Sequence, residues 1–332
     1  MKILICTGIY PPAIGGPAQY AKNLKEAIEE LGHEVSVSTY GTEKLFPTGI
    51  RHILFFIKIL PKMLKADFCI SLDTFSVGLP AALAGVVCRK KTIIRTGGDF
   101  LWEGYVERTS KKVLLKDFYQ TEKNSFSTKE QIIFKLTSWA LCQTHVLVFS
   151  TEWQRKIWSV PYALSSLKTV IVENFYGEKI LAPKAETKVF MAGTRKLKWK
   201  NLDVLEKAFS MAKEKDPSLF LDESNYPYEE FMEEIKKCYA VILVSLGDIS
   251  PNMILDAIQC NKPFILTKET GLYEKLKDVA IFVDPLNEEE IAEKIIYLSH
   301  QENYDKYLEK VKAFNYKHSW KQIAEEFLKA YD

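Results

Sequence analysis

Apolar and polar positions alternate along the chain in a pattern that predicts short buried strands separated by helices. Short apolar runs are typical of strands covered on both faces, and apolar residues three or four positions apart are typical of helices packed on a sheet. Strands that alternate with helices favour doubly wound parallel sheets. The predicted strands are Ile3–Cys6, Val35–Ser38, Phe68–Leu72, Thr92–Arg95, His145–Ser150, Thr169–Val172, Val189–Ala192, Leu219–Leu221, Ala240–Val244 and Ala280–Val283.

The first strand leads into a glycine-containing loop, Thr7–Gly16, and then into a helix that extends to about Leu31. The loop ends in Gly15-Gly16, but the G-x-G-x-x-G dinucleotide fingerprint is absent. Two adjacent glycines either permit a tight turn or bring backbone N–H groups close to a phosphate. Their place at a helix start favours the phosphate contact.

A basic and strongly apolar stretch, RHILFFIKILPKMLK, covers Arg51–Lys65 and is interrupted by Pro61. It fits a helix that lies on a membrane with Lys58, Lys62 and Lys65 at its edge. It also fits a helix packed on the sheet with solvated lysines, and we favour this second interpretation.

Acids and small residues follow two predicted strands, where parallel sheets bind ligands. Thr92–Arg95 is followed by TGGDFLWE, in which Asp99 either acts in a site or caps the next segment. Glu103–Thr128 has no clear periodicity, so we expect a loop there. Val189–Ala192 is followed by a basic turn from Arg195 to Lys200, which is either a solvated turn or an anion site.

The stretch Gly247–Pro263, GDISPNMILDAIQCNKP, predicts a loop and a helix after the buried strand Ala240–Val244. Ser250 suits the N-cap and Pro251 the first helical position. The free N–H groups of such a helix start attract phosphate. Seven residues separate Asp248, before the helix, from Asp256 on it.

Composition places the chain among ordinary globular proteins. It has 332 residues, enough for two domains, of which 47% are hydrophobic and 27% charged. The net charge of +2 does not indicate a nucleic-acid binder, and it is compatible with a membrane surface or an anionic substrate. Neither a secretory leader before the first strand nor a bilayer-spanning run is expected. The six cysteines are scattered without CxxC pairing, so we expect reduced residues of a cytosolic protein and no metal site.

The spacing of Asp248 and Asp256 resembles the Glu-x7-Glu signature of the retaining glycosyltransferases of family 4, which have the GT-B fold. Here both acids are aspartate, which makes an Asp-x7-Asp variant. The resemblance covers nearly the whole chain. It includes the G-D-x-x-W-E-like stretch, the Arg and Lys five apart at 195 and 200, and the family's domain exit, diphosphate turn and terminal helix at Glu173-Asn174, TKETGLYE and Ser319-Trp320.

The resemblance implies an α/β protein of GT-B fold, with two doubly wound, Rossmann-like parallel-sheet domains facing a cleft. The N-terminal acceptor-side domain would cover residues 1–174 and the linker 175–187. The nucleotide-sugar-binding domain would cover 188–315, and a crossover helix, 316–332, would return to the first domain.

The resemblance also implies metal-independent transfer of a sugar from a nucleotide diphosphate, such as a UDP- or GDP-sugar, to a glycan or lipid-linked acceptor, with retained configuration. Arg195 and Lys200 would stabilise the leaving diphosphate, Asp248 would reach a sugar hydroxyl and Asp256 the ribose. Asp99 would stand in for a histidine of many relatives, and Trp102 would suit stacking on a sugar. The donor set is Gly15, Gly16, Arg195, Lys200, Asp248, Ser250, Pro251, Asn252, Asp256, Thr270 and Gly271.

One departure from the family lies between Phe220 and Tyr239, where a β-α unit that holds the nucleotide base is missing. Together with the shorter acids, it leaves open a catalytically weak or inactive GT-B-like protein that binds a glycan or a partner enzyme. A nucleotide-sugar epimerase would need more acid and base groups than the sequence offers. We expect no cofactor, no nucleic acid and a cytoplasmic protein, and the sequence leaves contact of the N-terminal domain with the inner membrane face open.

Overall fold

The computed structural model describes residues 1–13, 15–164 and 168–331, and the chain divides into two compact units. Unit 1 comprises residues 1–101, 122–174 and the chain from 318 onward. Unit 2 comprises residues 102–121 and 175–317. The segment Trp102–Thr121, which the sequence analysis places in the N-terminal domain, therefore packs within unit 2.

Unit 1 is built on a six-stranded parallel sheet in the order β2-β1-β3-β4-β5-β6. This order reverses direction beside β1, as in doubly wound folds, and it confirms the predicted sheet. All four residues of both β3 and β5 are buried, which explains the apolar runs Phe68–Ile70 and Val146–Phe149. The strands are β1 Lys2–Thr7, β2 Glu34–Thr39, β3 Phe68–Ser71, β4 Lys91–Arg95, β5 Val146–Phe149 and β6 Thr169–Ile171.

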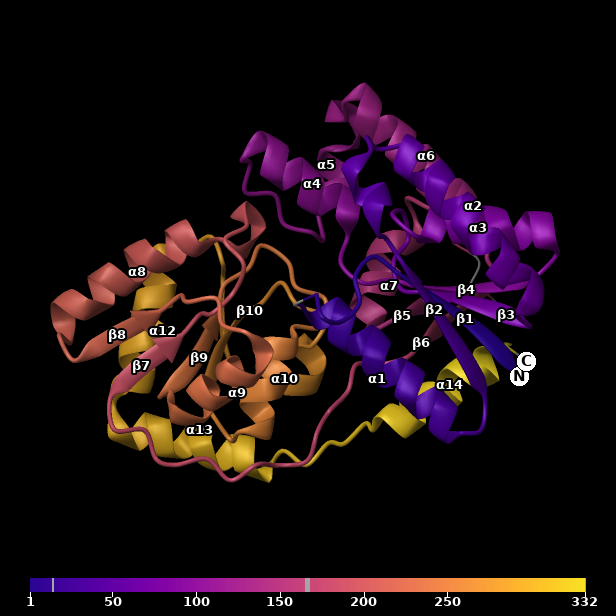
Figure 1. Ribbon diagram of the computed structural model, residues 1–332. Helices are drawn as coiled ribbons and strands as arrows, with labels where there is room; N and C mark the ends of the chain where they lie inside the picture. Colours follow the sequence, from indigo (N-terminus) through magenta and orange to yellow (C-terminus); the bar gives the residue numbers. More distant parts are fainter. Residues whose placement is uncertain (14, 165–167, 332) are drawn as a thin grey trace. The chain divides into compact units, whose positions relative to one another are not determined.

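Helices cover both faces of this sheet, with α1 and α14 on one face and α2, α3 and α6 on the other (Figure 1). The terminal helix α14 returns to unit 1, where Trp320 packs edge-on against Tyr20 of α1 at 5.0 Å between ring centroids. The predicted interruption of α2 at Pro61 is wrong, because the helix continues through this residue. The helices are α1 Gly16–Glu30, α2 Ile50–Lys65, α3 Gly78–Cys88, α6 Thr128–Gln143, α7 Glu152–Ser159 and α14 Trp320–Tyr331, with 3-10 turns Thr42–Leu45 and Lys123–Ser125.

Unit 2 contains a five-stranded parallel sheet in the order β11-β10-β9-β7-β8. One hydrophobic core lies between the sheet and helices α8 and α12, and a second lies between the sheet and helices α9 and α10. The strands are β7 Lys188–Met191, β8 Leu219–Asp222, β9 Ala240–Leu243, β10 Phe264–Thr267 and β11 Ile281–Val283. The helices are η4 Lys198–Lys200, α8 Leu202–Lys215, α9 Tyr228–Lys237, α10 Asn252–Gln259, α11 Tyr273–Leu276, α12 Glu288–Ser299 and α13 Gln301–Ala313.

The expected loop over Glu103–Thr128 is wrong, because helices α4, Phe100–Thr109, and α5, Phe118–Thr121, form in this region. Four buried residues of α4 lie one and four positions apart, which is helical spacing: Leu101, Trp102, Tyr105 and Val106. Charged residues between them obscure the period in the sequence. Between β8 and β9 the structure has a single helix, α9, as the sequence predicts.

Candidate active site

The part-buried ion pair between Lys200 and Asp248 is the centre of the candidate site in unit 2. Lys200 ends η4, after β7, and Asp248 follows β9, so both lie beyond the carboxyl ends of parallel strands. The Lys200 Nζ lies 2.6 Å from Asp248 Oδ2, and only 12% and 13% of the two side chains are exposed. The ammonium also lies 4.3 Å from the centroid of the Trp199 ring. Arg195, in the loop between β7 and η4, is exposed.

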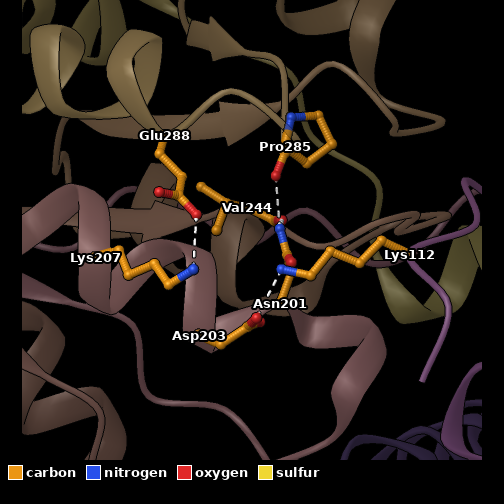
Figure 2. Close-up of polar contacts among 7 residues, drawn as sticks. All are labelled: Lys112, Asn201, Asp203, Lys207, Val244, Pro285 and Glu288. Atoms are coloured by element: carbon orange, nitrogen blue, oxygen red, sulfur yellow. Dashed lines mark hydrogen bonds and ion pairs between the residues drawn. The ribbon is translucent and has the colours of Figure 1, made fainter.

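Asn201 fixes the turn that presents Lys200. It is fully buried and has a left-handed backbone with φ 60°, which asparagine tolerates better than most residues. Its side-chain amide donates to the carbonyls of Val244, at 3.2 Å, and Pro285, at 2.7 Å (Figure 2). The sequence analysis missed Asn201, although an asparagine directly before a predicted helix is a recognisable signal.

The Asp248 loop is hydrogen-bonded to the turn after β10. The Asp248 N–H donates to the Glu269 carbonyl at 2.9 Å, and the Gly271 N–H donates to the Asp248 carbonyl at 3.2 Å. Asp248 and Thr270 form a parallel bridge. In this donor-free structure the Gly271 N–H, which the resemblance assigns to a diphosphate, is therefore taken by a protein carbonyl.

Helix α10 starts one residue later than predicted. It begins at Asn252, and Pro251 is the N-cap residue with an extended ψ of 113°, so Ser250 is not the cap. The helix ends at Gln259, two residues before Asn261, whose left-handed φ of 54° is typical of a helix end.

Asp256, on α10, is held in an environment that disfavours its charge. Its Oδ1 accepts a hydrogen bond from the Tyr228 hydroxyl of α9 at 3.4 Å. Burial raises the pKa of Asp256 to about 7, against an ordinary value near 3.9. The carboxyl therefore changes charge close to neutral pH. Tyr228 was not singled out from the sequence, because its contact with Asp256 joins two helices.

The predicted donor-binding glycines of unit 1 lie at the start of α1. Gly15 is the N-cap of α1 with φ 144°, where a Cβ atom would also lie 3.3 Å from Ile9 Cδ1, so glycine is favoured. Gly16 is the first residue of α1, and the preceding residue 14 lies outside the described part of the chain. No acid occupies the first turn of α1, which leaves the positive end of its dipole without a carboxylate of its own.

Asp99 has the contacts of a capping residue. It is 1% exposed, its Oδ1 accepts the Leu101 N–H at 3.1 Å, and its Oδ2 accepts the Trp158 indole N–H at 2.8 Å. Trp102 is also buried, and its indole N–H donates to the Val113 carbonyl. Its ring packs against Trp199 at 5.6 Å, so the predicted stacking of Trp102 on a sugar is not available in this structure.

Among the described residues, no group of three or more His, Cys, Asp or Glu residues is placed to hold a metal ion. Along the same residues, none of the helices combines the length and the apolar character needed to cross a bilayer.

Comparisons with known proteins identify the fold. No family model matches the sequence, and no curated protein sequence matches it either. Among solved structures, HepE from Anabaena in complex with UDP and glucose aligns with a TM-score of 0.69, at 13% identity over 99% of this chain and 98% of that one. Sucrose-phosphate synthase from Thermosynechococcus elongatus aligns with a TM-score of 0.69, at 13% identity over 100% and 98% of the two chains.

A trehalose-6-phosphate structure from E. coli bound with UDP-2-fluoro glucose aligns with a TM-score of 0.68, at 10% identity over 100% of this chain and 99% of that one. Together with the two parallel sheets, these likenesses show that the chain has the GT-B fold. At such low identity they show the fold alone.

Proposed function

We propose that the protein is a retaining glycosyltransferase, similar to family 4, that transfers a sugar from a nucleotide-diphosphate donor to a glycan or lipid-linked acceptor. The observation that carries the proposal is the part-buried Lys200–Asp248 pair at the carboxyl edge of a parallel sheet in a GT-B fold. A UDP-sugar is the favoured donor, because the similar structures of HepE and the E. coli protein hold UDP with glucose and UDP-2-fluoro glucose.

The proposed chemistry needs positive charge on the leaving group. When the bond between the sugar C1 and the diphosphate oxygen breaks, the diphosphate gains negative charge. The acceptor hydroxyl oxygen forms the new bond to C1 on the same face and passes its proton to the departing diphosphate oxygen. Lys200 and Arg195 would stabilise this charge without a metal ion. Asp248, released from Lys200, would accept a hydrogen bond from a hydroxyl of the transferred sugar. We leave Asp99 out of the catalytic set, because both of its carboxylate oxygens accept hydrogen bonds from the protein.

The rival function is a GT-B-like protein that binds its ligand without turnover. The Asp256 environment favours it, because a carboxyl with a pKa of about 7 is only half ionised at neutral pH. Binding of UDP and GDP by calorimetry, together with hydrolysis of several UDP- and GDP-sugars, separates the two. Slow donor hydrolysis supports the transferase. Binding without hydrolysis or transfer supports the rival, and no affinity for either nucleotide contradicts both.

Affinity for a nucleotide sugar is expected to fall as the pH drops through 7. Only the ionised Asp256 carboxylate accepts hydrogen bonds from both ribose hydroxyls, and protonation removes part of this capacity. From its pKa of about 7, affinity for UDP-glucose should fall about tenfold between pH 8 and pH 6. UDP-glucose is the suitable probe because it lacks the terminal phosphate that titrates near pH 6.

The matched control for this pH dependence is Asp256→Asn, which should bind UDP-glucose more weakly at pH 8 and lose most of the dependence. An unchanged pH profile in the variant would assign the dependence to another group and remove Asp256 from the ribose site.

We further propose that unit 1 contacts an anionic membrane surface through an apolar ridge on α2. The ridge residues are between 50% and 64% exposed: Ile50, Ile53, Ile57 and Leu64. The opposite face of α2 is buried, so the helix both packs on the sheet and offers apolar surface to a partner. The cations Lys44, Lys65 and Arg89 are exposed on α2 or on segments in contact with it and would attract anionic lipid.

The lysines predicted at the membrane edge have other roles in part. Lys58 forms an ion pair with Glu43 and donates to the Thr39 carbonyl, and Lys62 donates to the Val37 carbonyl. These two side chains fasten α2 to the end of β2. The ridge and the exposed cations carry the membrane proposal.

Ile53→Asp combined with Ile57→Asp is expected to reduce co-sedimentation with vesicles rich in phosphatidylglycerol by about tenfold or more. Each change places a negative charge where the membrane would otherwise bury exposed apolar area. Ile132→Asp on α6 is the matched control, since Ile132 is also exposed, at 52%. Equal binding by the double variant and the control would contradict the ridge as the contact surface.

A further inference from the structure

The segment Trp102–Thr121, called the strap from here on, docks on the loops that carry the candidate site in unit 2. The Leu115 N–H donates to the Leu246 carbonyl at 3.2 Å, in the loop between β9 and Asp248. Gly247 has no room for a side chain there, because a Cβ atom would lie 2.5 Å from Leu115 Cβ. The strap therefore packs closely on the backbone next to Asp248.

Three lysine side chains connect the strap to the rest of unit 2. Lys112 Nζ lies 2.7 Å from Asp203 Oδ2 at the start of α8 (Figure 2). Lys198 Nζ donates to the Glu107 carbonyl at 2.8 Å. Lys116 Nζ lies 2.5 Å from Glu269 Oε1 in the loop after β10. The three contacts reach the loops after β7 and β10, and Leu115 reaches the loop after β9, so the strap covers the edge where the proposed donor would bind.

The Lys116–Glu269 pair differs from the other two in its buried partner. Glu269 is 5% exposed, and its Oε2 is buried without a hydrogen-bond partner among the described residues. Burial raises the pKa of Glu269, while the Lys116 ammonium opposes that rise. A buried carboxylate with one oxygen lacking a hydrogen bond costs free energy, so the Lys116–Glu269 pair is easily given up for a better partner. Asp203, the partner of Lys112, is 60% exposed.

Glu269 and Asp248 belong to one hydrogen-bonded loop pair, and each holds a lysine. Lys200 pairs with Asp248, Lys116 pairs with Glu269, and the Asp248 N–H donates to the Glu269 carbonyl. Two ammonium groups are thus neutralised by two carboxylates on adjoining backbone. A donor diphosphate carries two negative charges, enough to pair with both lysines in place of the two carboxylates.

We propose that Lys116 is a further diphosphate-binding residue, which exchanges Glu269 for the donor diphosphate while the strap holds it over the site. This inference rests on the proposed function, because it takes the diphosphate of a nucleotide sugar as the ligand. It adds a cation from the strap to a site whose other cations, Arg195 and Lys200, come from the segment after β7.

The test measures UDP affinity by calorimetry for the full-length chain and four variants. Lys116→Gln is expected to bind UDP about 10- to 100-fold more weakly, the effect of losing a hydrogen bond to a charged group. Lys116→Arg keeps the charge and should stay within about threefold of the parent. Lys112→Gln, the matched control on the same strap, should stay within about twofold. Glu269→Gln should bind UDP several-fold more tightly, because Lys116 is no longer held by a competing carboxylate.

A merely structural role gives a different result. Lys116→Gln would then lower the melting temperature and leave UDP affinity unchanged, which overturns the proposal. A Glu269→Gln variant that binds no more tightly than the parent overturns the exchange of partners. If the unaltered protein binds neither UDP, GDP nor pyrophosphate, the proposed function itself fails, and this outcome is distinct because it appears before any variant is compared.

Tryptic cleavage of the donor-free chain gives a readout that does not depend on a nucleotide. Lys111, Lys112 and Lys116 are strap sites that docking should protect. Glu269→Gln is expected to accelerate cleavage there several-fold, and an unchanged rate overturns the pairing of Lys116 with Glu269 as the contact that holds the strap.

Discussion

Lys200→Gln is expected to lower the turnover number for sugar transfer by about 100- to 1,000-fold, the cost of removing one group aimed at charge that develops in a transition state. The Lys200 side chain is 12% exposed, so water screens its charge less than that of a surface lysine. The effect on UDP affinity should be smaller than the effect on turnover, because the leaving diphosphate carries more charge in the transition state than in the bound donor. Turnover at saturating donor, with UDP release as the signal, measures it.

Two controls isolate this effect. Lys207→Gln removes a lysine from α8 that pairs with Glu288 at 3.2 Å and is 64% exposed (Figure 2), and it should leave turnover within about twofold. Lys200→Gln leaves Asp248 buried without its cation, so melting temperatures of both variants must be compared first. Turnover near that of the parent in a folded Lys200→Gln variant would remove this lysine from the chemistry.

Local sequence signals predicted the strands and the terminal helix well, because a buried parallel strand is marked by its own apolar residues. β9 shows this most clearly, since all four of its residues are buried. β10, Phe264–Thr267, is equally buried but was not among the predicted strands. The pairing of a lysine after one strand with an acid after the next strand in the sheet also follows from local signals. Both ends meet at one edge of the sheet, which is how Lys200 and Asp248 come together.

Contacts between distant segments could not be predicted in this way. Lys116 and Glu269 are 153 positions apart, and nothing near either residue indicates the other. The contact of Trp102 could not be predicted either. Trp102 lies in a polar stretch of the sequence, which suggests exposure, but its ring is buried against Trp199. Burial of this kind is decided by tertiary packing, and a single sequence without an alignment carries no record of it.

Backbone hydrogen bonding explains the remaining errors at the site. A glycine turn was expected to present N–H groups to phosphate, yet the Gly271 N–H is used to join two loops. Ser250 was expected to cap α10, yet the extended backbone of Pro251 moves the helix start one residue further. Both outcomes depend on the φ and ψ values of a few loop residues, which propensities fix only loosely.

The charge arrangement of the site has a consequence for how it responds to ligands. In the donor-free protein, carboxylates pair with the lysines of the site. A diphosphate that binds must therefore compete with these negatively charged groups. Removing a competing carboxylate should strengthen ground-state binding, even where the same carboxylate is needed for the reaction. For such a substitution, UDP affinity should rise while turnover falls. A substitution that only disturbs the fold would lower both.

Asp248→Asn tests this opposition. It removes the negative charge 2.6 Å from Lys200, so UDP affinity should rise several-fold. Turnover should fall about 100-fold, because the amide is a weaker acceptor for the sugar hydroxyl and no longer stabilises positive charge at C1. Calorimetry with UDP and steady-state assays with the nucleotide sugar measure the two quantities. Asp278→Asn, at an exposed position of the same unit, is the control and should change neither. A parallel loss of affinity and turnover in Asp248→Asn would show that the carboxylate supports the loop rather than competing for Lys200.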